Sequence, residues 1–224
     1  MPQSAARTSA AKVVAACCLC MVMSQRAAFA EWHFTPFIGV TFKGNTTIID
    51  PELATGDKHA ALGGTVTRLG AGILGAEAVF EIIPGFFQGK PGRTDSAGSP
   101  IQSGVIESSR VTALMGNIVL TAPRKYTEYF LRPIVSGGFG LLRAARTEAP
   151  GGQQVDVFPL DANFAGFNIG GGAVGFFSQN TGVRFDLRYF STLHDTERAG
   201  IATNQNEPVH LRYMTLSVGV VIRR

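Results

Sequence analysis

The sequence predicts an all-β protein, an eight-stranded antiparallel up-and-down transmembrane β-barrel. Apolar and polar residues alternate in segments of about 9–13 residues, close to the length of a transmembrane strand. There are eight such segments, and outer-membrane barrels have an even number of strands. The connections between the segments alternate between long and short, which is typical of external loops and periplasmic turns.

The first thirty residues have the features of a secretory signal peptide. A basic stretch that contains Arg7 and Lys12 precedes an apolar run ending at Met23, and Ala28-Phe29-Ala30 supplies small residues at the cleavage site. We therefore expect export and a location in the cell outer membrane. The expected domains are a signal peptide over 1–30 and an outer-membrane β-barrel over 31–224.

Removal of this segment changes what the composition implies. The chain has 20 Lys and Arg and 16 Asp and Glu, but three basic residues and all three cysteines lie within the first thirty positions. The remaining chain is close to neutral, so the main support for a nucleic-acid partner disappears. We expect no cofactor and no metal, because the four histidines lack the spacing of metal ligands.

The predicted strands follow the alternation in chain order. In the first, Trp32 and Phe34 lie on one face and His33 and Thr35 on the other. In the third, Phe80 shares a face with Ala76, Ala78 and Ile82, opposite Glu77 and Glu81. In the seventh, Val183, Phe185, Leu187 and Tyr189 lie opposite Arg184, Asp186 and Arg188. The expected strands are 32–42, 60–69, 72–82, 108–120, 128–142, 164–177, 181–193 and 209–222.

The long connections distinguish a membrane barrel from a soluble β-protein. They cover about 43–59, 83–107, 143–163 and 194–208, and they are separated by short turns. With both chain ends on the inner side, every long loop lies outside. A soluble periplasmic lipocalin-like barrel that binds a small apolar ligand has no reason to keep this parity, but it remains the alternative.

Aromatic residues near predicted strand ends suggest girdles at the membrane interfaces. These interfacial aromatics are Trp32, Phe34, Tyr129, Phe130, Phe176, Phe177 and Tyr189. They favour outer-membrane lipid as the surroundings of the barrel.

Four segments resemble the OmpA-like eight-stranded outer-membrane β-barrel proteins. They are WHFTPFIGVT at 32–41, LRPIVSGGFGLL at 131–142, NIGGGAVGFF at 168–177 and GVRFDLRYF at 182–190. The resemblance lies in the strand pattern and extends over essentially the whole chain after residue 30. It implies the fold and says little about function.

An eight-stranded barrel is just wide enough for side chains to fill its interior. The third and seventh strands lie opposite each other in such a ring. We therefore expect Glu77 and Glu81 to face Arg184 and Arg188 across the lumen, with Asp186 and Arg132 nearby. Gly138, Gly140, Gly170 and Gly172 are expected to make room for the guanidinium groups. This network predicts a plugged lumen, and a narrow gated pore is the alternative.

The sequence points to a structural or surface-interaction role rather than catalysis. His194-Asp195 with Ser191 suggests a lipid-modifying barrel enzyme, but neighbouring strand residues point to opposite faces and no G-x-S-x-G elbow occurs. We therefore expect no enzyme and no catalytic residue. A surface ligand would bind the loops 83–107 and 143–163, and we expect a monomer.

Overall fold

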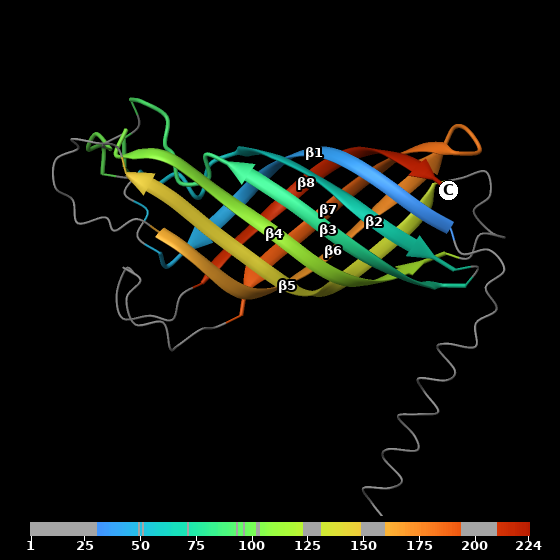
Figure 1. Ribbon diagram of the computed structural model, residues 1–224. Helices are drawn as coiled ribbons and strands as arrows, with labels where there is room; N and C mark the ends of the chain where they lie inside the picture. Colours follow the sequence, from blue (N-terminus) through green and yellow to red (C-terminus); the bar gives the residue numbers. More distant parts are fainter. Residues whose placement is uncertain are drawn as a thin grey trace, which may run out of the picture. The chain divides into compact units, whose positions relative to one another are not determined.

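The computed structural model describes ten stretches of the chain (Figure 1). They are residues 31–48, 50, 52–70, 72–92, 94–95, 97–101, 104–122, 131–148, 160–193 and 210–224. The predicted signal peptide and loop 194–208 lie outside these residues. In the part of the chain that is described, no helix is long and apolar enough to cross a membrane.

Eight strands form one closed barrel in which every strand pairs antiparallel with its sequence neighbours, and β8 closes the ring against β1 (Figure 1). The strands are β1 Glu31–Thr46, β2 His59–Leu69, β3 Leu74–Pro84, β4 Ile106–Thr121, β5 Arg132–Glu148, β6 Leu160–Phe176, β7 Thr181–Thr192 and β8 Leu211–Arg223. This topology confirms the predicted eight-stranded up-and-down transmembrane barrel.

The predicted boundaries are wrong at the end of β1, which continues to Thr46 instead of ending at residue 42, and at β5 and β6. The expected loop 143–163 is shorter than predicted, because β5 continues to Glu148 and β6 begins at Leu160. Arg146 pairs with Leu160 at the end of this ladder. The residues at this end of the β5–β6 pair are charged or small, a composition typical of a loop. They nevertheless form paired strands that extend beyond the apolar band on the external side. At its other end β5 starts at Arg132, later than the expected residue 128.

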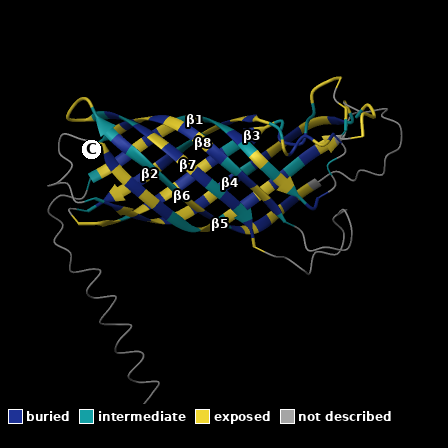
Figure 2. Cartoon of the chain, turned by 180° about the vertical axis from the view of Figure 1, so that it is seen from behind, coloured by how far each residue is buried: buried dark blue, intermediate teal, exposed yellow. Residues whose placement is uncertain are grey.

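Side chains alternate between the lumen and the outer surface along each strand, as the pattern of buried and exposed residues in Figure 2 shows. The exposed side is apolar: Ile118 is 66% exposed and Phe139 is 68% exposed. The buried side carries Glu77, Arg184 and Arg188. A lipocalin-like protein would have the opposite distribution, an apolar lumen and a polar exterior, so the two faces fit a barrel in lipid.

The lumen is filled in three layers. The middle layer is polar and charged, and an apolar cluster packs on each side of it. The cluster at the turn end, where both termini of the barrel lie, comprises Leu69, Val119, Ile134, Val174 and Val221, with Phe176 packed against it. The cluster at the long-loop end is larger and includes Ile48, Phe86, Phe87, Phe164, Phe190 and Tyr213.

Candidate functional site in the lumen

Glu77 connects two opposite walls of the barrel. It projects inward from β3, and its carboxylate oxygens lie 2.6 Å from Arg184 Nη1 and 2.7 Å from Arg188 Nη2, both on β7. All three side chains are almost completely buried. The long arginine side chains span the width of an eight-stranded lumen, so the ion pairs link β3 to β7 across it at this level.

Asp186 balances the charge of the second arginine. Its carboxylate accepts hydrogen bonds from Arg184 Nε at 2.5 Å and Nη2 at 3.0 Å, and from Arg188 Nη2 at 3.2 Å. Two carboxylates and two guanidinium groups thus form a buried set without net charge, which we name the lumen quartet: Glu77, Arg184, Asp186 and Arg188. Buried charges require such partners, because an isolated one would be strongly destabilising.

Neutral side chains extend the quartet around the ring. Thr67 on β2 donates to Glu77 Oε2 at 3.0 Å, and Asn117 on β4 donates to Glu77 Oε1 at 3.2 Å. Asn168 on β6 donates to the Asn117 amide oxygen at 2.7 Å. Glu77 therefore accepts from four side chains on three strands, which makes it the centre of the network.

The structure does not bring all six predicted network residues together. Glu81 lies two inward positions further along β3, beyond Val79, and accepts a hydrogen bond from Thr215 on β8 at 3.0 Å. Arg132 lies at the start of β5, where its Nε donates to the Ala122 carbonyl at 2.9 Å. The prediction considered only which strands face each other, and it did not consider the height of each residue along the barrel axis. At their observed heights, Glu81 and Arg132 lie away from the quartet.

The glycines predicted to make room for arginines mostly serve another purpose. A Cβ on Gly138 would lie 1.9 Å from the Gly116 carbonyl oxygen, and a Cβ on Gly140 or Gly172 would likewise meet the backbone of the neighbouring strand. Only at Gly170, among these four, would the Cβ approach a guanidinium-bearing side chain, at 2.6 Å from Arg188 Cγ. The glycines therefore allow close strand packing around the lumen.

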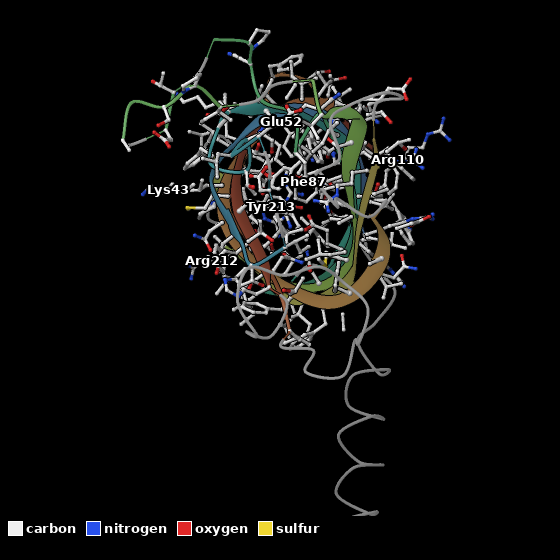
Figure 3. The ribbon with its side chains drawn as sticks, turned by 90° about the vertical axis from the view of Figure 1, so that its left-hand side faces the viewer. Lys43, Glu52, Phe87, Arg110, Arg212 and Tyr213 are labelled. Carbon is white, nitrogen blue, oxygen red and sulfur yellow. The ribbon has the colours of Figure 1, made fainter. Side chains whose placement is uncertain are left out.

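Described residues of two long loops meet at the external mouth of the lumen. Glu52, in the connection between β1 and β2, is 1% exposed. Its carboxylate accepts from the backbone N–H of Gly89 at 2.5 Å, Gly104 at 3.0 Å and Ile106 at 3.0 Å. Figure 3 shows Glu52 at this mouth, above Phe87 and Tyr213. We name these three hydrogen bonds the Glu52 clamp. The sequence does not predict it, because the donors lie 37 to 54 residues further along the chain than Glu52.

Phe86 and Phe87, in the connection after β3, are fully buried. The Phe86 ring lies 5.5 Å from the ring of Tyr213, which stacks on Phe190 at 5.0 Å. Within loop 83–107, where a surface ligand is expected, these two aromatic residues are therefore buried in the barrel and not exposed on the loop surface. Lys90, in the same loop, is exposed.

The predicted interfacial aromatics occupy different positions. Trp32 and Phe34 are exposed on the outer face at the turn end, and Arg68 lies over the Trp32 ring at 5.6 Å. Phe177 is exposed beside the turn after β6, and Tyr189 lies near Phe167. Tyr129 and Phe130 lie outside the described residues.

Phe176 is not an interfacial residue. It shares the inward face of β6 with Val174, packs edge-on against His33 at 5.4 Å and lies under the Arg223 guanidinium. The strand alternation that places Val174 inside also places Phe176 inside, so its ring helps to close the turn end of the lumen.

The residues that suggested catalysis are not brought into a described site. Ser191 donates to the Thr192 carbonyl, and His194 and Asp195 lie outside the described residues. Within the described stretches no three His, Cys, Asp or Glu side chains gather as metal ligands would.

Comparisons with known proteins find similarity among solved structures. No family model matches the chain, and no curated protein sequence matches it. Among solved structures, Neisserial surface protein A is similar at 11% identity with a TM-score of 0.50, over 86% of this chain and 96% of that one. Ail of Yersinia pestis has 11% identity and a TM-score of 0.49, covering 87% and 99%. A major outer membrane protein from Thermus thermophilus has 13% identity and a TM-score of 0.46, covering 86% and 99%.

The order of the strands, the apolar outer face and the charged lumen point to the same architecture as the similarity to Neisserial surface protein A. An identity of 11% carries the fold alone. The chain therefore has the fold of the small eight-stranded outer-membrane β-barrels.

Proposed function

We propose that this protein is a closed, non-conducting outer-membrane barrel with a structural or surface-interaction role. The observation that carries the proposal is the filled lumen, in which the lumen quartet lies between two apolar clusters. A steady water path would have to pass all three layers. The Glu52 clamp and the buried Phe86 and Phe87 support the same reading.

Planar-bilayer recording tests this proposal. We expect the purified protein to show no steady conductance, in preparations whose folding is checked by heat-dependent migration on a denaturing gel. Steady, large conductance from folded protein would overturn the closed barrel. Brief openings that disappear when the lumen quartet is altered would instead favour the narrow gated pore.

The external location of the long loops is part of the proposal. Two of these loops pack over the lumen, and exposed parts such as Lys90 are available to a partner at the cell surface. Protease treatment of intact cells should cleave within the loops and leave the strands protected. Protection of every long loop on intact cells would contradict this orientation.

We further propose that residues 1–30 are removed on export and that the protein is a monomer. N-terminal sequencing of protein from the outer-membrane fraction should then start at Glu31, after Ala30. Light scattering in detergent, corrected for bound detergent, should give the mass of one chain. An intact N-terminus or a dimer mass would contradict the respective part.

A further inference from the structure

The β1 strand carries an irregularity at its external end. The pairing of β1 with β8 shifts register between Phe42 and Asn45, and Lys43 within this bulge has a φ of 52°. A left-handed backbone is unfavourable for a residue with a side chain, and bulges often redirect side chains near functional sites. Here the bulge leaves the Lys43 side chain exposed on the outside of the barrel.

A second cation lies beside this lysine. Arg212 on β8 is the register partner of Asn45 and is exposed on the same outer surface. Figure 3 shows Lys43 and Arg212 on one side of the mouth, both pointing away from the barrel. His210 Nε2 lies 3.3 Å from Asn45 Oδ1. We name these four residues the basic patch: Lys43, Asn45, His210 and Arg212.

The backbone beneath the basic patch is firmly held. The His210 carbonyl accepts from Thr46 Oγ1 at 2.9 Å and from the Thr47 N–H at 3.0 Å, and the His210 N–H donates to Thr47 Oγ1 at 2.9 Å. These bonds join the start of β8 to the end of β1. The two cations are therefore displayed from a fixed backbone rather than from a flexible loop.

The basic patch borders the apolar band of the barrel. On β8, the outward residues from Met214 through Leu216 and Val220 to Ile222 are apolar. These positions cover roughly 26 Å of strand at about 3.3 Å per residue, which a tilt near 40° reduces to about 20 Å across the membrane. Arg212 is the next outward position beyond this band, so it lies at the level of the lipid headgroups.

The opposite side of the barrel has cations at the same end, but an acid neutralises part of their charge. Arg143 on β5 forms an exposed two-point ion pair with Asp161 on β6, with nitrogen–oxygen distances of 2.9 and 2.8 Å. For Lys43 and Arg212, by contrast, the described residues provide no carboxylate within ion-pair distance. Among the described residues, therefore, the charges of Lys43 and Arg212 are not neutralised by an acid.

We propose that the basic patch binds the phosphorylated headgroup of a glycolipid in the outer leaflet. The argument rests on the charge of Lys43 and Arg212, on the hydrogen-bonding groups of Asn45 and His210, and on the continuity of the patch with the lipid-facing band. Acyl chains would lie along the apolar face while phosphate oxygens contact the cations. The proposal requires a membrane barrel but does not require a closed lumen.

Native mass spectrometry of the full chain in detergent tests the proposal with two probes, diphosphoryl lipid A and dephosphorylated lipid A. The wild-type protein should retain the phosphorylated lipid in preference to the other. The double variant K43Q/R212Q should lose roughly fivefold affinity per removed cation. The matched control, Arg143→Gln, removes another exposed external cation, on the other side of the barrel, and should bind as the wild type.

Three results would overturn the proposal: equal retention of both lipids by the wild type, unchanged binding by K43Q/R212Q, or an equal loss in Arg143→Gln. Excess inorganic phosphate should compete only weakly, and full displacement by it would indicate a site for free phosphate instead of a lipid. Heat-dependent gel migration checks that each variant is folded. Because binding is measured without conductance, failure here leaves the closed-lumen proposal untouched.

Discussion

Glu77→Gln is the sharpest test of the lumen quartet. The substitution keeps the size of the side chain and removes its charge. Arg184 and Arg188 then share the single carboxylate of Asp186, so the buried set carries one excess positive charge. In the wild type both oxygens of Glu77 accept from arginines. The NH₂ group of the introduced glutamine would therefore place a hydrogen-bond donor against an arginine N–H donor.

The expected loss follows from the burial of the pair. Removal of one partner from a buried ion pair destabilises a protein by about 3–5 kcal/mol, because the remaining charge stays away from water. The side chains of Glu77 and Arg184 are 0% and 2% exposed, so solvent screening does not reduce this range. With a urea dependence of about 2 kcal/mol per molar, the unfolding midpoint should fall by about 2 M.

Equilibrium unfolding in urea, with the barrel refolded into lipid vesicles, measures this loss. Trp32 is the only tryptophan of the chain and lies on the outer face, so its fluorescence reports the transfer from lipid to water. Arg143→Gln, which breaks an exposed ion pair, is the matched control and should leave the midpoint unchanged within error.

A double-mutant cycle separates charge pairing from packing. Glu77→Gln combined with Arg188→Gln restores neutrality, so the second change should cost less in the Glu77→Gln background than in the wild type, with a coupling of about 1–3 kcal/mol. A midpoint shift of Glu77→Gln no larger than that of the control, or strictly additive changes, would refute the quartet as a buried ionic network.

Further substitutions test other parts of the structure. Phe139→Arg should cost about 2–4 kcal/mol in vesicles because the residue lies near the middle of β5 and faces lipid, and a neutral outcome would contradict the membrane-facing band. Gly138→Ala should prevent closure of the barrel, because its Cβ would lie 1.9 Å from a carbonyl oxygen; Gly72→Ala, which meets nothing within 4 Å, should fold normally on the same heat-shift gel. Glu52→Ala should free the loop after β3, so proteinase K should cut there faster while the strands stay protected; unchanged cleavage would show that the clamp is dispensable.

Period-2 alternation made the strands and their faces predictable. Because successive residues of a strand point to opposite faces, the apolar neighbours of Glu77 and Arg184 place these two side chains inside, from the sequence alone. The same reasoning was available for Phe176, which shares its face with Val174, but its place near a strand end favoured the wrong assignment to a girdle. The limits of β5 and β6 were misjudged because charged residues above the apolar band lose the membrane pattern.

The sequence by itself determined the number of strands, the alternation of loops and turns, and the presence of charged residues of both signs on the inward faces. Each follows from local spacing along the chain. Tertiary structure alone decided which inward charges meet, because the stagger of a closed barrel sets the height of each residue. In the folded barrel the arginines form ion pairs with Glu77, whereas Glu81 accepts from Thr215. The fold also places the Glu52 carboxylate next to backbone N–H donors that lie far along the chain. Such meetings depend on barrel closure, and no local pattern encodes them.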